Sequence, residues 1–129
     1  MKRMKKVISI VDDDPSVREG MMDLLRSMDF DVEAFERATD FLNSDRLRST
    51  SCLIADVQMP KMTGLELYDR LIGLGNIIPT ILITAFPNPR DKACAQRAGV
   101  TCYLAKPFTE SELLNCIHEA LARRHTGGR

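Results

Sequence analysis

The chain alternates short apolar runs with amphipathic segments along nearly its whole length. Runs of five or six mostly apolar residues predict β-strands at 7–11, 31–35, 52–56, 79–84 and 100–105. The segments after them carry apolar residues three and four positions apart and predict helices at 15–28, 39–44, 64–74, 90–98 and 109–124. Parallel strands need helical crossovers, so this alternation predicts an α/β fold with a doubly wound five-stranded parallel sheet, (βα)5.

The helix starts carry their own local signals. Asp14 is followed by a proline, a pair that suits the cap and first position of a helix. Thr63-x-x-Glu66 and Thr109-x-x-Glu112 are capping-box patterns, in which each side chain bonds the other residue's backbone N–H. These signals support helices beginning just after residues 14, 63 and 109.

Charge argues against a nucleic-acid partner for this domain. Its 129 residues suit one domain, and 18 basic residues balance 18 acidic ones. Affinity for DNA comes largely from neutralised phosphates, so a chain without net positive charge is a poor candidate.

The sequence also argues for a cytoplasmic protein without a membrane segment. The basic start, MKRMKK, is followed by only five apolar residues, too few for a signal peptide. No apolar run approaches the length that spans a bilayer. The four cysteines have no C-x-x-C spacing, which favours reduced, mostly buried thiols over a zinc site or disulfides.

Polar residues stand where the predicted strands end. Asp12 and Asp13 follow the first strand, Asp56 ends the third, Thr84 ends the fourth, and Lys106 follows the fifth. In a parallel sheet these ends meet at one edge, where doubly wound folds bind ligands. An acidic turn alone is ordinarily only solvated, but five such positions at one edge predict a site.

Clustered carboxylates need a cation, and hard oxygen ligands suit Mg²⁺. The same set outlines a phosphoryl-transfer site. Asp56 is the candidate nucleophile, while Mg²⁺ and Lys106 would neutralise charge on the transferred group. The Thr84 hydroxyl could bond one of its oxygens.

With these residues in place, the sequence closely resembles the receiver domains of two-component response regulators. The resemblance runs from about Val7 to Arg123 and rests on VDDD, ADVQMPKMTG, TA and YLAKPF, in order at strand ends. It implies a flavodoxin-like fold with strand order 2-1-3-4-5 and a receiver domain over residues 1–124. Residues 125–129 would then be a disordered tail or the start of a linker.

The resemblance also implies a role for each site residue. Asp56 would accept a phosphoryl group from a sensor histidine kinase. Asp12, Asp13, Asp56 and the backbone carbonyl of Gln58 would hold Mg²⁺, for which Mn²⁺ or Ca²⁺ could substitute.

Lys106 would pair with Asp56, and its bond to Pro107 resembles one that is cis in the family. Thr84 would move toward the phosphoryl group and Tyr103 would follow it. The alternative, that Tyr103 is only a strand aromatic with a solvated hydroxyl, is the less favoured of the two. The surface over residues 90–124 would change and control homodimerisation or an output domain, with transcriptional regulation expected if that domain binds DNA.

Two other functions are compatible with such a fold. A Mg²⁺-dependent phosphatase with an aspartyl-phosphate intermediate usually has a second acid two residues after its nucleophile, where this chain has Gln58, which cannot donate a proton as an acid. A flavodoxin-like cofactor binder would need a phosphate-binding loop rich in Gly, Ser or Thr, and DDDPS would repel phosphate. The switch is therefore the preferred function, while the sequence leaves open whether the domain stands alone or is joined to another.

Overall fold

The computed structural model describes residues 5–127, with side chains through residue 122. The strands are β1 (Val7–Val11), β2 (Asp31–Phe35), β3 (Cys52–Asp56), β4 (Thr80–Thr84) and β5 (Cys102–Ala105). The helices are α1 (Pro15–Ser27), α2 (Ala38–Leu42), α3 (Gly64–Gly73), α4 (Pro89–Ala98) and α5 (Glu110–Gly127). A single 3₁₀ turn, Leu47–Ser49, lies between α2 and β3.

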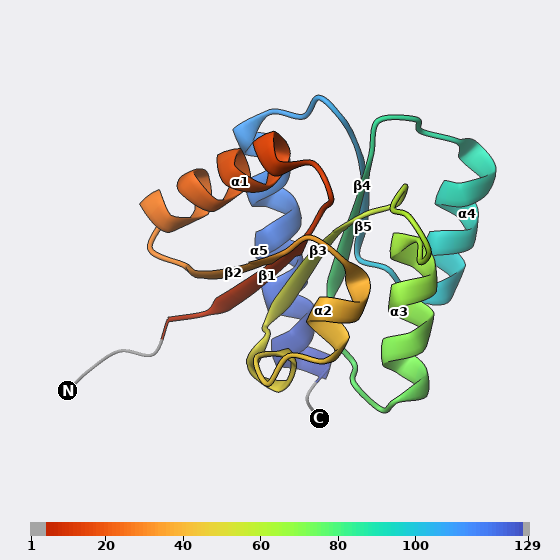
Figure 1. The fold of residues 1–129 in the computed structure, drawn as a ribbon, viewed down its shortest axis with the longest axis horizontal. Coiled ribbons are helices and arrows are strands. Elements are labelled where there is room, and N and C mark those ends of the chain that lie inside the picture. The colour runs from red at the N-terminus through yellow and green to blue at the C-terminus, as the bar shows by residue number, and fades with distance from the viewer. Residues whose placement is uncertain (1–4, 128–129) are drawn as a thin grey trace.

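The five strands form one parallel sheet in the order β2-β1-β3-β4-β5, which confirms the predicted fold. Helices α1 and α5 cover one face of the sheet, and α2, α3 and α4 cover the other (Figure 1). Strand β2 therefore lies on one side of β1 and strands β3, β4 and β5 lie on the other. Because all five strands are parallel, their carboxyl ends share one edge of the sheet.

Burial separates the central strands from the edge strands. Every residue of β1, β3 and β4 is buried, because helices cover both faces of these strands. Ile8 and Ile10 pack with α1 and α5, whereas Leu53 and Ala55 pack on the side of α3. Each fully buried Ile or Leu side chain contributes roughly 2 kcal/mol from its removal from water. The alternating run 31–35, predicted as half-buried or at an edge, is the edge strand β2.

The predicted helix starts are confirmed at α1 and α3. The carboxylate of Asp14 accepts a hydrogen bond from the backbone N–H of Ser16 at 2.9 Å. Thr63 and Glu66 form the reciprocal capping box, with bonds of 2.9 and 3.1 Å.

Helix α4 begins one residue earlier than predicted. Pro89 is its first residue and Asn88 is its N-cap, accepting from the backbone N–H groups of Arg90 and Asp91. Gly99 ends the helix with a φ of 106°, a left-handed conformation that glycine adopts without steric cost.

Two helices end more than one residue from their predicted ends: α2 ends at Leu42 rather than at 44, and α5 ends at Gly127 rather than at 124. Helix α2 is short, and the 3₁₀ turn after it was not predicted because three residues carry no helical periodicity. Helix α5 starts at the predicted Thr109-x-x-Glu112 box, with bonds of 2.8 and 3.1 Å, and reaches Gly127. The first three residues of the predicted tail, 125–129, are thus helical backbone, and the last two lie outside the described residues.

Gly64 allows α3 to begin directly beneath the end of β3. A Cβ added here would lie 2.6 Å from the carbonyl oxygen of Asp56 and 3.0 Å from Leu82 Cδ2. A glycine at this position therefore permits close approach of two backbone segments, and this approach sets the distance between α3 and the Asp56 loop.

We expect Gly64→Ala to destabilise the fold by about 1–3 kcal/mol, because the new methyl group meets backbone that cannot move independently. Gly20→Ala is the matched control. Apart from the surrounding backbone of its own helix, no atom lies within 4 Å of a Cβ there, so the substitution should stabilise the fold by about 0.5–1 kcal/mol. Urea unfolding of both variants measures this difference, and equal effects at the two positions would contradict it.

Candidate functional site

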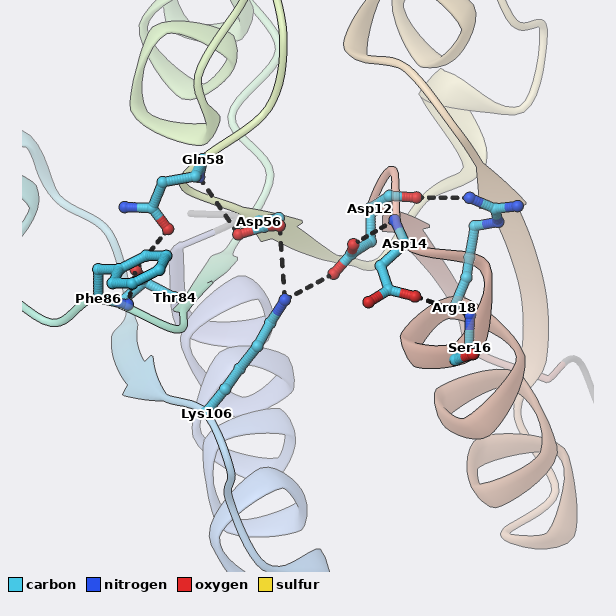
Figure 2. Close-up of polar contacts among 9 residues, drawn as sticks. All are labelled: Asp12, Asp14, Ser16, Arg18, Asp56, Gln58, Thr84, Phe86 and Lys106. Carbon is cyan, nitrogen blue, oxygen red and sulfur yellow. Dashed lines mark hydrogen bonds and ion pairs between the residues drawn. The ribbon is translucent and has the colours of Figure 1, made fainter.

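The shared edge of the sheet brings the predicted site residues together. Asp12 and Asp13 follow β1, Asp56 ends β3, Thr84 ends β4 and Lys106 follows β5. One carboxylate oxygen from each of Asp12, Asp13 and Asp56 lies within 4.8 Å of the other two. Figure 2 shows the Asp12, Asp56 and Lys106 side chains pointing toward one another from separate segments.

Lys106 is the cation of this cluster. Its Nζ lies 3.2 Å from Asp12 Oδ2 and 3.4 Å from Asp56 Oδ2, and its side chain is only 17% exposed (Figure 2). Its backbone N–H donates to the carbonyl of Thr84 at 2.8 Å, and its bond to Pro107 is cis, as the resemblance implied. Backbone and side chain of Lys106 therefore connect β1, β3 and β4 at the sheet edge.

The backbone around Asp12 holds its carboxylate in place. Asp12 Oδ1 accepts from the N–H of Asp14 at 2.9 Å, and the Asp12 N–H donates to the carbonyl of Phe35. Arg18 reaches back from α1 and donates through Nη1 to the Asp12 carbonyl at 2.7 Å. Sequence reasoning missed Arg18, since nothing in its spacing indicates a bond to a loop carbonyl.

The electrostatics leave the cluster short of positive charge. Burial raises the pKa of Asp56 above its ordinary value and the Asp12 carboxylate raises it further, while Lys106 and the N–H of Gln58 only partly offset them. For Lys106, burial lowers the pKa, but the carboxylates of Asp12 and Asp56 outweigh it and the net shift is upward. Lys106 therefore stays charged, and a further cation would stabilise the ionised carboxylates.

The residues present fit a Mg²⁺ ion on the chemistry of their donors. Asp12 and Asp56 are buried, and Asp13, the most exposed of the three, closes the group from the loop after β1. All the donors are carboxylate oxygens, which Mg²⁺ binds while keeping several waters.

Thr84 is held by two neighbours. Its hydroxyl donates to Gln58 Oε1 at 2.6 Å and accepts from the backbone N–H of Phe86 at 3.0 Å (Figure 2). The bond between the Gln58 side chain and Thr84 was not predicted, because sequence spacing does not show that the loop after β3 contacts the end of β4.

Tyr103 lies on β5, beside the loop that leads to α4. Its hydroxyl accepts from the backbone N–H of Asn88 at 3.3 Å. Tyr103 also lines a pocket of about 130 Å³ between β4, α3 and α4. Thr84 and Tyr103 are thus on neighbouring strands, with Thr84 buried and Tyr103 partly exposed.

The cysteines lie apart from the acidic cluster. All four are free thiols, of which only Cys52 is buried. Burial, with a smaller effect of Cys116, raises the pKa of Cys52 to about 12, so this thiol stays protonated at neutral pH.

Comparison with known protein families matches residues 8–118 to the response regulator receiver domain. The chain is 40% identical over 121 residues to the response regulator protein TmoT of Ectopseudomonas mendocina, covering 94% of this chain and 55% of TmoT. It is 36% identical to the transcriptional regulatory protein TdiR of Thauera aromatica, covering 89% of this chain and 51% of TdiR.

Solved structures agree with this match. The response regulator StyR superposes with a TM-score of 0.87 at 40% identity, covering 95% of this chain and 62% of StyR. The BeF3-activated receiver domain of DrrB superposes with a TM-score of 0.82 at 26% identity, covering 93% of this chain and all of that one.

The chain belongs to the response regulator receiver domain family, whose members are signalling phosphoacceptors of two-component systems rather than enzymes. It spans about half the length of the curated relatives that it matches. Family membership implies a cognate histidine kinase. Among the described residues, no helix is both long and apolar enough to cross a membrane.

We expect Asp56→Asn to raise the melting temperature of the metal-free domain by on the order of 3 °C, because it removes a charge that burial and Asp12 disfavour. The folded-state pKa of Asp56 is raised, so its ionisation destabilises the fold as pH rises from the unfolded value, 3.8, through the folded one. The gain should therefore be small below pH 3.8 and should grow as the pH rises through the folded-state pKa of Asp56.

Calorimetry at several pH values, with a chelator present, measures this gain. Asp69→Asn, at an exposed position of α3, is the matched control and should change little. A clear fall in the melting temperature of Asp56→Asn at neutral pH would contradict a crowded acidic site.

Proposed function

We propose that this domain is a phosphorylation-driven switch in which Asp56 accepts a phosphoryl group from a sensor histidine kinase. The observation that carries this is the position of Asp56, which is 5% exposed. Its carboxylate lies 3.4 Å from the Lys106 ammonium and has an oxygen within 4.8 Å of carboxylate oxygens of Asp12 and Asp13. A carboxylate nucleophile flanked by fixed positive charge is what transfer of an anionic group requires.

Asp12, Asp13, Asp56 and the backbone carbonyl of Gln58 are the proposed Mg²⁺ ligands, and Mn²⁺ or Ca²⁺ are the proposed substitutes. The ion would supply positive charge that offsets the charge of the phosphoryl oxygens. The raised pKa of Asp56 supports a role for a cation, since the protein's own groups do not fully compensate this cluster.

In the proposed reaction, a carboxylate oxygen of Asp56 attacks phosphorus and the P–N bond to the kinase histidine breaks. The phosphoryl group then carries its charge next to Lys106, which already bonds to Asp56 and so needs little movement to follow it. The Thr84 hydroxyl, at the end of the neighbouring strand, donates a hydrogen bond to a phosphoryl oxygen.

The response would pass from Thr84 to the surface over residues 90–124. Tyr103 supports this route, because it lines the 130 Å³ pocket and its hydroxyl accepts a hydrogen bond from the N-cap residue of α4. Movement of the ring into that pocket would release Asn88 and alter the face of α4, β5 and α5. Homodimerisation through this face is the proposed consequence.

Transcriptional regulation is the proposed output. TdiR is named a transcriptional regulatory protein, and this chain matches about half of it. In this proposal the receiver domain over residues 1–124 acts in the cytoplasm and touches no nucleic acid itself. The residues after 124 begin a connection to an output domain.

We expect the wild type to gain the mass of one phosphoryl group when incubated with Mg²⁺ and acetyl phosphate, and Asp56→Asn to gain none. Chelation of Mg²⁺ should abolish the gain. Lys106→Ala should reduce it at least about tenfold in rate, because a buried cation next to the nucleophile is removed.

Intact-mass spectrometry over time measures these rates. Lys6→Ala, at an exposed position before β1, is the matched lysine control and should react like the wild type. A phosphoryl gain in Asp56→Asn equal to that of the wild type would refute Asp56 as the acceptor.

We also expect phosphorylation to strengthen homodimerisation, and Lys92→Glu to weaken the dimer by on the order of tenfold. Lys92 lines a groove on this face with Pro87, Asn88, Tyr103 and others, so reversal of its charge acts on both copies of a symmetric contact. Analytical ultracentrifugation with and without acetyl phosphate measures the dissociation constant.

Arg26→Glu, on the exposed side of α1 across the sheet, is the control. If it weakens the dimer as much as Lys92→Glu does, the 90–124 face is not the interface.

A further inference from the structure

The hydroxyl of Thr84 can donate one hydrogen bond, and a neighbouring side chain already accepts that bond. Thr84 Oγ1 donates to Gln58 Oε1 at 2.6 Å, while the N–H of Phe86 occupies one of its acceptor positions at 3.0 Å. A hydroxyl donates only one hydrogen bond. A phosphoryl oxygen can therefore accept a hydrogen bond from Thr84 only if the bond from Thr84 to Gln58 breaks.

Gln58 is well placed to restrain Thr84 in the resting domain. It lies two residues after Asp56, and its backbone N–H donates to Asp56 Oδ1 at 3.2 Å. Its side chain then spans from the loop after β3 to the end of β4 (Figure 2). Gln58 thus bonds to Asp56, the proposed phosphoacceptor, through its backbone and to the Thr84 hydroxyl through its side chain.

We propose that Gln58 is a positioning residue that restrains the Thr84 hydroxyl in the unphosphorylated domain. The phosphoryl group then competes with Gln58 Oε1 for the one hydrogen bond that this hydroxyl donates. This inference rests on the proposed function, in which Thr84 donates to that group. Hydrogen bonds to a charged acceptor are roughly twice as strong as neutral ones, so the exchange still favours the phosphoryl oxygen. The free energy needed to break the bond between Thr84 and Gln58 therefore opposes the change to the phosphorylated arrangement.

The test uses BeF₃⁻ with Mg²⁺ as a mimic of the phosphoryl group, with its dissociation constant measured by NMR titration. Gln58→Met keeps the length of the side chain and removes the amide acceptor. Loss of one neutral hydrogen bond from the resting state should tighten BeF₃⁻ binding about fivefold. Gln58→Glu keeps an acceptor oxygen and should not tighten binding.

The effect must pass through the Thr84 hydroxyl, so each Gln58 variant is also made with Thr84→Val and with Thr84→Ser. In the Thr84→Val background, Gln58→Met should leave the dissociation constant of BeF₃⁻ unchanged. In the Thr84→Ser background, which keeps the hydroxyl, Gln58→Met should still tighten binding. The serine background keeps the test usable if Thr84→Val folds poorly. For Gln58→Glu, the change in BeF₃⁻ affinity that persists in the Thr84→Val background is due to the added charge, and the remainder is due to the Thr84 hydroxyl.

Unchanged or weaker BeF₃⁻ binding by Gln58→Met, or equal tightening with and without the Thr84 hydroxyl, would overturn the restraint and leave the proposed function standing. A wild type that shows no Mg²⁺-dependent BeF₃⁻ binding would overturn the proposed function, and the restraint with it.

Discussion

The ammonium of Lys106 between the carboxylates of Asp12 and Asp56 is the interaction on which this edge of the sheet depends. Both carboxyl side chains are nearly inaccessible, at 0% and 7% exposed, and an unpaired buried charge costs several kcal/mol. Lys106 compensates both at once, and its backbone N–H also bonds to the end of β4. One residue after β5 thereby holds the ends of three other strands in a fixed relation.

That compensation is incomplete, and in the proposed switch this deficit is what lets the edge respond to added charge. The pKa of Asp56 stays above its ordinary value in spite of Lys106, so the resting site favours any added cation. In the proposed function, a phosphoryl group on Asp56 would offer the Thr84 hydroxyl a second acceptor besides Gln58 Oε1. Small electrostatic changes act strongly on elements that have two discrete arrangements, and in our proposal the bond between Thr84 and Gln58 belongs to the resting one.

Much of the fold follows from patterns that are local in sequence. The run 31–35 alternates and becomes an edge strand, whereas VISIV and CLIAD are continuously apolar and become central strands covered on both faces. The Thr63-x-x-Glu66 box and Asp14 cap their helices as predicted. The 3₁₀ turn and the cap at Asn88 were not predicted, since short turns carry no periodicity and many asparagines occur in loops without capping a helix.

The sequence by itself determined the alternation of strands and helices, and hence that Asp12, Asp13, Asp56, Thr84 and Lys106 share one edge of a parallel sheet. Only the tertiary structure decided how these groups pair. The double contact of Lys106, the support of Asp12 by Arg18 and the bond from Thr84 to Gln58 join residues whose separation along the chain says nothing about their distance. Loop conformation sets these contacts, and it depends on close approaches such as that of Gly64 to Asp56, which exist only once the helices pack on the sheet.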